Sequence, residues 1–321
     1  MKFIQQIKLE KKFLVEAISF WLKTRRYNAS NHTEYDMEKM QYVLSRQTHT
    51  IEKGLSLRNP RKGFGQNKVE KLLDDMNNYV TMYYSADKEF VRYPIDTIAH
   101  YIEYTKSFGV NIQCIEEKFN KLIIRTGILP NKTRGGVISI YKQDIISSCH
   151  SSFKELMESR HSVRYFSNIV PKKDIIDKAL EIAQRTPSAC NRQGWKTHVF
   201  LGDKSVELVK WQGGAHGFEE EIKGTILVTA NLKAFLYYEV HQSYIDGGLY
   251  AMNLINSLHS LGLGTIPLSL GFESEKLNTL RHFGIPDNET PILIIGFGYL
   301  EDTFKVAISE RKNITLTNTY H

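Results

Sequence analysis

The pattern of apolar residues changes near residue 150, and this change limits the possible folds more than any single motif does. In the first part, apolar residues recur at helical spacing, as in Phe13, Leu14, Ala17, Ile18 and Trp21. In the second part, short apolar runs typical of strands alternate with helical segments. We therefore expect a mainly helical region over residues 1–150 and an α/β or α+β sandwich over residues 151–321.

The same patterns give approximate element bounds. In the first region we expect helices over residues 4–27, 33–53, 67–85, 94–109 and 112–125, and a linker over residues 127–140. In the second region we expect helices over residues 152–159, 172–185 and 244–261, and strands over residues 196–201, 224–230 and 291–296. The stretch 261–272 has three glycines and a proline, and we expect a turn followed by an apolar loop there.

Charge is distributed unevenly along the 321 residues, whose formal net charge is +7. Residues 1–150 contain 24 Lys and Arg against 16 Asp and Glu, whereas residues 151–321 contain 18 against 19. A basic first region can attract nucleic acid, an anionic membrane or a phosphorylated ligand. The alternative is a solvated surface that faces a less basic domain.

Several sequence features indicate the cellular compartment of the protein. No run of 18 apolar residues is present, so we expect no transmembrane helix. The basic, Glu-containing N-terminus lacks a signal-peptide pattern. The three separated cysteines fit a reducing compartment, and neither they nor the histidines form a zinc motif. We expect a cytoplasmic protein with no metal site, in which the helix over residues 4–27 docks on its own protein or rests on a membrane surface.

Four short segments of the second region contain residues suited to binding a ligand. In Arg160-His161-Ser162-Val163-Arg164, alternate residues of an extended chain place two guanidinium groups and a hydroxyl on one side. In the turn over residues 186–195, small residues allow close backbone approach, and Asn191 and Gln193 each offer a donor and an acceptor.

The other two segments lie further along the chain. Asp246 is a candidate cap of a long helix that ends in Gly-Leu-Gly-Thr and continues into the stretch 261–272. Near the C-terminus, Arg311 is a candidate phosphate ligand. The nearby Gly296 and Gly298 lack the third glycine and the helix of a dinucleotide fingerprint, so we reject a Rossmann site.

In this order the four segments resemble the nitroreductase family of FMN enzymes, from about Phe153 to His321. The resemblance implies an α+β sandwich with helices around a mixed, mainly antiparallel sheet. It also implies a homodimer with FMN at the subunit interface and NAD(P)H as electron donor. The sequence departs from the family pattern at Gly194, where proline is usual, in residues 267–271, which lack a glutamate, and in its short C-terminus.

The resemblance also implies which residues contact FMN. The phosphate and ribityl chain would meet Arg160, His161, Ser162, Arg164 and Arg311. The flavin ring would meet Pro187, Ser188, Ala189, Asn191, Gln193, Pro267, Leu268, Ser269, Leu270 and Gly271. No catalytic side chain is expected, because the flavin performs the redox chemistry.

Three functions follow from these observations. The first is NAD(P)H-driven reduction of a small organic acceptor by a ping-pong mechanism. The second is a specialised flavin reaction in surface-polysaccharide or metabolite biosynthesis. The third is a non-catalytic protein that binds an anionic polymer or membrane through the basic first region, although we expect no nucleic acid partner.

The first region contains one further motif. Residues 49–55, His-Thr-Ile-Glu-Lys-Gly-Leu, together with residues 63–65, Gly-Phe-Gly, resemble an extension carried by some nitroreductase-like proteins of surface-polysaccharide gene clusters. Its cations favour an anionic ligand or a cover over the flavin pocket, and the alternative is an ordinary helix-loop-helix.

Overall fold

The computed structural model describes residues 2–27, 37–84, 87–149, 151–236 and 239–321, and its contacts separate two compact units. Unit 1 consists of Met1–Arg26 and Ile140–Phe304, and unit 2 of Tyr27–Ser139 and Lys305–His321. These units differ from the expected division at residue 150, because the first helix groups with the sheet and the C-terminal segment groups with the helical unit.

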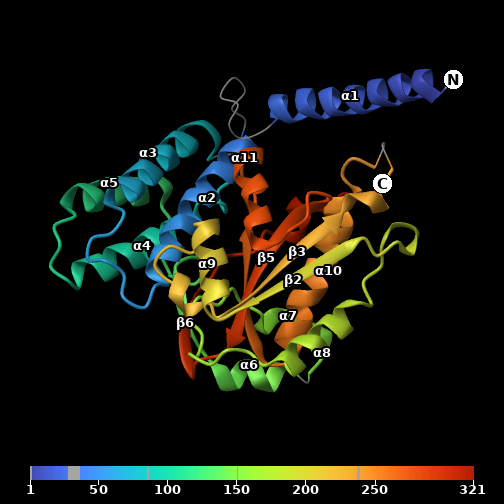
Figure 1. Ribbon diagram of the computed structural model, residues 1–321. Coiled ribbons are helices and arrows are strands. Elements are labelled where there is room, and N and C mark those ends of the chain that lie inside the picture. Colours follow the sequence, from blue (N-terminus) through green and yellow to red (C-terminus); the bar gives the residue numbers. More distant parts are fainter. Residues whose placement is uncertain (1, 28–36, 85–86, 150, 237–238) are drawn as a thin grey trace. The chain divides into compact units, whose positions relative to one another are not determined.

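Unit 1 is built on an antiparallel sheet of four strands (Figure 1). In spatial order these strands are β2 (Trp195–Leu201), β3 (Gly224–Asn231), β5 (Glu289–Tyr299) and β4 (Leu263–Ser269). Each neighbouring pair runs antiparallel, and the register shifts once, between Val228 and Thr229. The α+β class and the three expected strands are confirmed.

Two helices, α8 (Lys173–Ala183) and α10 (Gln242–Ser260), contribute to the core of unit 1. Tyr250, Leu254 and Leu258 of α10 pack with Ile226 and Ile295 of the central strands. Burying one such side chain contributes about 1.5–3 kcal/mol, so this layer is a main source of stability for unit 1. The remaining helices of the unit are α1 (Lys2–Tyr27), α6 (Lys142–Ser148), α7 (Phe153–Ser159), α9 (Asp203–Gln212) and α11 (Ser274–Asn278).

The structure corrects part of the secondary-structure prediction. Residues 263–269, expected to be a loop, form β4, and the expected linker contains the start of β1 (Val137–Tyr141). β1 pairs with β6 (Thr303–Ala307) in a separate two-stranded sheet. The helices α6, α9 and α11 and the strand β6 are further elements that the sequence patterns did not indicate.

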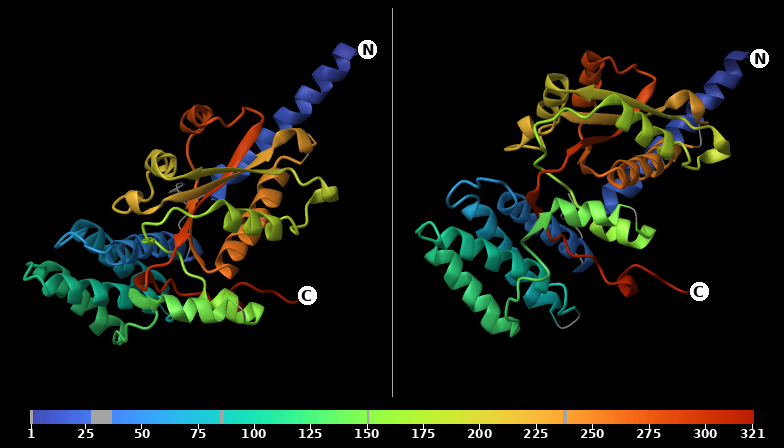
Figure 2. Two further views of the ribbon diagram at one scale, coloured as in Figure 1. Left: turned by 60° about the horizontal axis from the view of Figure 1, so that its bottom comes forward. Right: turned by 90° about the horizontal axis from the view of Figure 1, so that it is seen from below.

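In the described part of unit 2, four α-helices surround one apolar core (Figure 2). These are α2 (Met37–Leu55), α3 (Gln66–Tyr83), α4 (Arg92–Lys106) and α5 (Gln113–Thr126), each close to its expected range. Leu44, Leu72, Met76, Ile98 and Ile115 are fully or almost fully buried between them. No described helix has both the length and the apolarity needed to cross a bilayer.

The structure explains the motif around residues 49–55 as a packing and hydrogen-bonding unit. A Cβ on Gly54 would lie 2.1 Å from the Phe64 ring, so only glycine allows α2 to approach that ring. The buried carboxylate of Glu52 accepts hydrogen bonds from the Tyr93 hydroxyl at 2.8 Å and the Gly136 amide at 3.0 Å. Burial beside this carboxylate strongly raises the pKa of Tyr93.

Candidate functional site

The segment 160–164 follows α7 and runs beside the start of β4. The Val163 amide donates to the Thr265 carbonyl at 2.9 Å, and Ser162 forms an isolated parallel bridge with Thr265. Arg160 and Ser162 are partly exposed. Arg164 is only 4% exposed, and its guanidinium lies 6.0 Å from the centroid of the Phe218 ring. The segment therefore presents Arg160 and Ser162 to solvent and encloses Arg164.

The turn between α8 and β2 has an unusual backbone. Cys190, Asn191 and Gln193 all have positive φ angles, of 51°, 52° and 49°. This left-handed conformation is unfavourable for residues other than glycine, so its repetition requires support from the surroundings. In this turn the Asn191 and Gln193 side chains are exposed, and the Gln193 amide donates to the Asn191 side-chain oxygen at 3.2 Å.

Asp246 on α10 supplies part of that support. Its carboxylate is buried, with 1% exposure, and it accepts hydrogen bonds from the Ala189 amide at 3.2 Å and the Gln242 side chain at 2.7 Å. The sequence suggested that Asp246 caps the helix. The structure corrects this, because α10 begins at Gln242 and Asp246 anchors the turn instead.

Other residues that sequence reasoning missed also hold the turn. Arg192 forms a bidentate ion pair with Glu239, with distances of 2.7 and 2.6 Å, and this pairing lowers the pKa of Glu239 to about 2. Asn253 donates to the Thr186 hydroxyl at 2.7 Å. Their partners are distant in sequence, so no local pattern could have identified them.

The predicted residues 267–271 lie at the end of β4, which is an edge strand. Pro267, Ser269 and Gly271 are exposed, whereas Leu268 and Leu270 are buried. This alternation is typical of a strand with one face packed in the core. Leu268 and Leu270 are therefore core residues in this structure, and only their neighbours present atoms to solvent.

Within unit 1 the structure joins two of these segments to neighbouring elements, and one predicted residue belongs to unit 2. Residues 160–164 adjoin β4 through Thr265, and the turn with Pro187, Ser188 and Ala189 adjoins α10 through Asp246. Arg311 belongs to unit 2, where its guanidinium donates to the Ser309 carbonyl at 3.0 Å.

A buried histidine lies close to the first of these segments. His259, in the last turn of α10, is 2% exposed, and its Nε2 lies 2.9 Å from the Ser159 hydroxyl. Burial, together with the nearby charge of Arg160, lowers the pKa of His259 to about 4. The imidazole is therefore neutral at pH 7 and acts as a structural hydrogen-bonding group.

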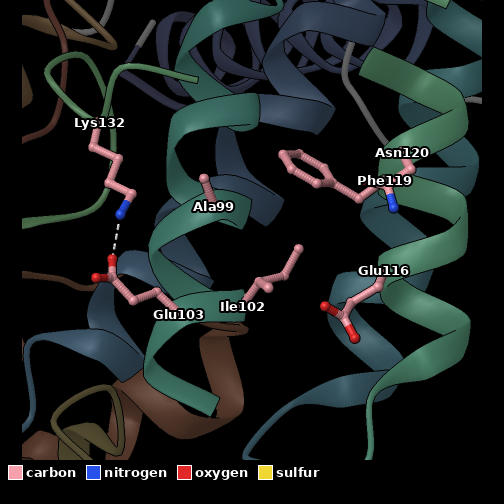
Figure 3. Close-up of a pocket in the computed structure, with 7 residues that line it drawn as sticks. All are labelled: Ala99, Ile102, Glu103, Glu116, Phe119, Asn120 and Lys132. Atoms are coloured by element: carbon pink, nitrogen blue, oxygen red, sulfur yellow. Dashed lines mark hydrogen bonds and ion pairs between the residues drawn. The ribbon is translucent and has the colours of Figure 1, made fainter. Parts of the chain in front are cut away.

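Unit 2 contains a cavity of about 400 Å³ lined by α4, α5 and Lys132 (Figure 3). Glu103 on α4 pairs with Lys132, and Glu116 on α5 pairs with Lys106 at 2.7 Å. Figure 3 shows Ile102 between the two carboxylates and Phe119 above them. Because both carboxylates already have cationic partners, this cavity offers little chemistry for a ligand.

Comparisons with known proteins match the second half of the chain. The model of the nitroreductase family matches residues 157–232 and 237–299. Two proteins named "Putative NADH dehydrogenase/NAD(P)H nitroreductase" are similar. The one from Archaeoglobus fulgidus is 27% identical over 46% of this chain and 85% of its own. The one from Methanothermobacter thermautotrophicus is 23% identical over 45% and 75%.

Solved structures are similar to the same half. A nitroreductase family protein from Streptococcus pneumoniae is 24% identical over 53% of this chain and all of its own, with a TM-score of 0.45. A protein from Exiguobacterium sibiricum, described as a "putative nitroreductase in complex with FMN", is 20% identical over 53% and 98%, with a TM-score of 0.44.

Proposed function

The second half of the chain is a nitroreductase-like α+β domain, and from this premise we propose that the protein is an FMN-dependent oxidoreductase driven by NAD(P)H. The match of the family model to residues 157–299 supports an oxidoreductase of this type. The observation that most supports the flavin is the anchored turn that exposes Asn191 and Gln193. Two adjacent amides offer both donors and acceptors to the polar edge of a flavin ring.

Two of the other predicted residues fit the phosphate of FMN. Arg160 and Ser162 present a guanidinium and a hydroxyl, which suit a phosphate group. The buried Thr265 hydroxyl, next to Ser162, has no hydrogen-bond partner among the described residues, so it can accept or donate to a ligand. The assignment of Arg311 to the same phosphate stays a prediction.

When bound, FMN would supply hydride transfer from NAD(P)H to a small organic acceptor in a ping-pong order. The residues of the chain position the ring. Asp246 holds the backbone of the turn through Ala189, while the ion pair between Arg192 and Glu239 fixes its far end. Exposed Pro267 and Ser269 at the end of β4 form a surface against which a planar ring can pack.

We also propose that the active form is a homodimer, because α10 exposes an apolar stripe. Ile245, Leu249 and Met252 recur at helical spacing and are 51%, 47% and 37% exposed, and Tyr244 beside them is 53% exposed. Several large apolar side chains on one helix face are typical of a protein interface. The same helix also holds the Asp246 that anchors the proposed flavin turn.

The visible absorption spectrum of the purified full-length protein tests the cofactor. We expect flavin bands near one FMN per chain after FMN is added and the excess removed. Arg160→Gln should weaken FMN binding about tenfold or more, since a charge-assisted contact contributes about 1.5–3 kcal/mol. Lys204→Gln, an exposed charge on α9, is the matched control. A protein that stays colourless after reconstitution rules out the proposal.

Turnover assays test the reaction itself. We expect the flavin-loaded protein to oxidise NADH or NADPH with quinone or nitroaromatic acceptors. A flavin-loaded protein that turns over every such acceptor slowly would favour the specialised biosynthetic reaction instead.

A further inference from the structure

A cavity of about 680 Å³ is lined by residues of unit 2. Its wall is formed by α2, by residues 87–93 at the start of α4, and by the segment that follows β6. Three aromatic side chains line it, namely Tyr42, Phe90 and Tyr93. The volume lies in the range of about 300–1,000 Å³ that is typical of small-molecule sites.

Acidic groups in this wall already have local partners. The Asp87 carboxylate accepts from the Glu89 and Phe90 amides, each at 3.1 Å, and from the Gln41 side chain at 2.9 Å. Glu89 pairs with Arg134 at 2.7 Å, and Glu310 pairs with the same guanidinium. Glu89 and Glu310 thus share the Arg134 guanidinium, and Glu89 also pairs with Arg92 at 3.1 Å.

Other cations in the wall are not neutralised in this way. Arg46 and Lys312 form no ion pair with a described carboxylate. The Lys312 ammonium lies 4.4 Å from the centroid of the Tyr42 ring, which holds it at the wall without cancelling its charge. His49 and Arg311 line the same cavity. The residues that line the cavity thus include four Lys and Arg side chains against three carboxylates, beside aromatic surface.

The floor of the cavity is built on the buried Glu52. Its carboxylate receives the Tyr93 hydroxyl at 2.8 Å and lies 3.7 Å from His49 Nδ1. Because Glu52 is fully buried and also binds the Gly136 amide, it holds the Tyr93 side chain in a fixed position, whereas the His49 side chain is 53% exposed. A wall whose side chains are held in this way loses little entropy when a ligand binds.

We propose that this cavity binds a phosphorylated small molecule of nucleotide size other than FMN, in which case Arg311, which lines it, serves this ligand and not the flavin phosphate. Arg46 and Lys312 would contact the phosphate, because guanidinium and ammonium groups form charge-assisted hydrogen bonds with its oxygens. The aromatic side chains would contact the organic part. The site uses the motif at residues 49–55, whose His49 lines the cavity and whose Glu52 lies beneath it.

Calorimetric titration of the full-length, FMN-saturated protein tests this proposal. The probes are AMP, glucose 6-phosphate, inorganic phosphate and adenosine. We expect saturable binding of about one AMP or glucose 6-phosphate per chain, weaker binding of phosphate, and none of adenosine. Tighter AMP binding would indicate a nucleotide ligand, and tighter glucose 6-phosphate binding a sugar phosphate.

Two variants locate the site. Arg46→Gln and Lys312→Gln should each weaken phosphate-ester binding about tenfold or more, since each removes a charge-assisted contact. Lys121→Gln removes the same charge from an exposed position on α5 and should have little effect. Circular dichroism would verify that each variant is folded.

Three results would overturn the inference. In the first, no phosphate probe binds saturably to the wild-type protein. In the second, Lys121→Gln weakens binding as much as the cavity variants do. In the third, AMP displaces FMN and Arg46→Gln loses flavin, which would make this cavity the flavin's own phosphate site. Because flavin content is read from the spectrum, this third result is distinguishable from failure of the proposed oxidoreductase function.

Discussion

Asp246 joins two segments that are 57 residues apart in the chain, and its replacement tests how the proposed flavin turn is held. Asp246→Ala removes the acceptor of the Ala189 amide and of the Gln242 side chain. Hydrogen bonds to charged groups contribute about 1.5–3 kcal/mol each, so we expect the free energy of unfolding to fall by a few kcal/mol. FMN affinity should fall as well, because Cys190, Asn191 and Gln193 lose support for their left-handed backbone. Urea unfolding and flavin titration measure the two effects.

Asp246→Asn is the matched variant, because it keeps an acceptor oxygen and nearly the same volume. It should have a smaller effect on both quantities. If Asp246→Ala unfolds at the wild-type urea concentration, the carboxylate does not anchor the turn.

His259 predicts a pH dependence of stability. Its folded pKa of about 4 lies below the unfolded value of 6.5, so the unfolded state binds more protons between these two values. The free energy of unfolding should therefore decrease as the pH falls from about 6.5 to about 4, by about 3 kcal/mol from this residue, and show no further loss from it at lower pH.

His259→Gln isolates this contribution, because glutamine can retain a hydrogen bond with Ser159 but does not titrate. We expect the wild-type midpoint of thermal unfolding to drop more than that of the variant between pH 7 and pH 4.5. Equal drops in the two proteins would show that another group controls acid stability.

At the scale of elements, β4 is a strand that the sequence patterns did not predict. Glycines and Pro267 indicated a loop, yet the residues form an edge strand. Proline is tolerated on an edge, where the missing amide costs no ladder hydrogen bond. A Cβ on Gly264 would lie 2.7 Å from Leu300, so this glycine serves close packing rather than a turn. The longer helices and the three predicted strands have regular apolar spacing and were found, whereas β4 depends on neighbours distant in sequence.

The residues of the candidate flavin site show the same distinction between local patterns and contacts with residues distant in sequence. The order of short polar segments indicated a nitroreductase-like domain, and the chemistry of Asn191 and Gln193 made them candidates for contact with the flavin. Arg192, Glu239 and Asn253 were not, because they act through partners brought close only by the fold. Gly194, which replaces the usual proline, has a packing role, since its Cβ would lie 3.0 Å from both Ala234 and Phe235.

The exposed stripe of α10 gives a prediction at the same scale. Leu249→Glu places a charge in the middle of the proposed dimer interface and should shift the protein toward the monomer, because burying an unpaired charge is unfavourable. Light scattering measures the mass of the particle, and the absorption spectrum measures its flavin content. We expect the mass and the flavin content to fall together. Ile124→Glu, on the 83% exposed position of α5, is the control. A dimer that persists in Leu249→Glu would show that subunits meet elsewhere.

At the scale of the whole molecule, each compact unit has its own apolar core, so the two should unfold with separate stabilities. The three tryptophans, Trp21, Trp195 and Trp211, all belong to unit 1, so tryptophan fluorescence reports on that unit alone. Far-ultraviolet circular dichroism reports on the helices of both.

Gly54→Ala therefore separates the two units in one experiment. The added methyl group meets the Phe64 ring in the core of unit 2, and overpacking of this kind costs about 1–3 kcal/mol. We expect the dichroism transition to move to lower temperature while the fluorescence midpoint stays in place. Gly54→Ala combined with Phe64→Leu should recover part of the loss, because leucine leaves room for the methyl group. If fluorescence and dichroism shift equally, the two units unfold as one cooperative body, and a ligand bound in the cavity of unit 2 would also stabilise the proposed flavin domain.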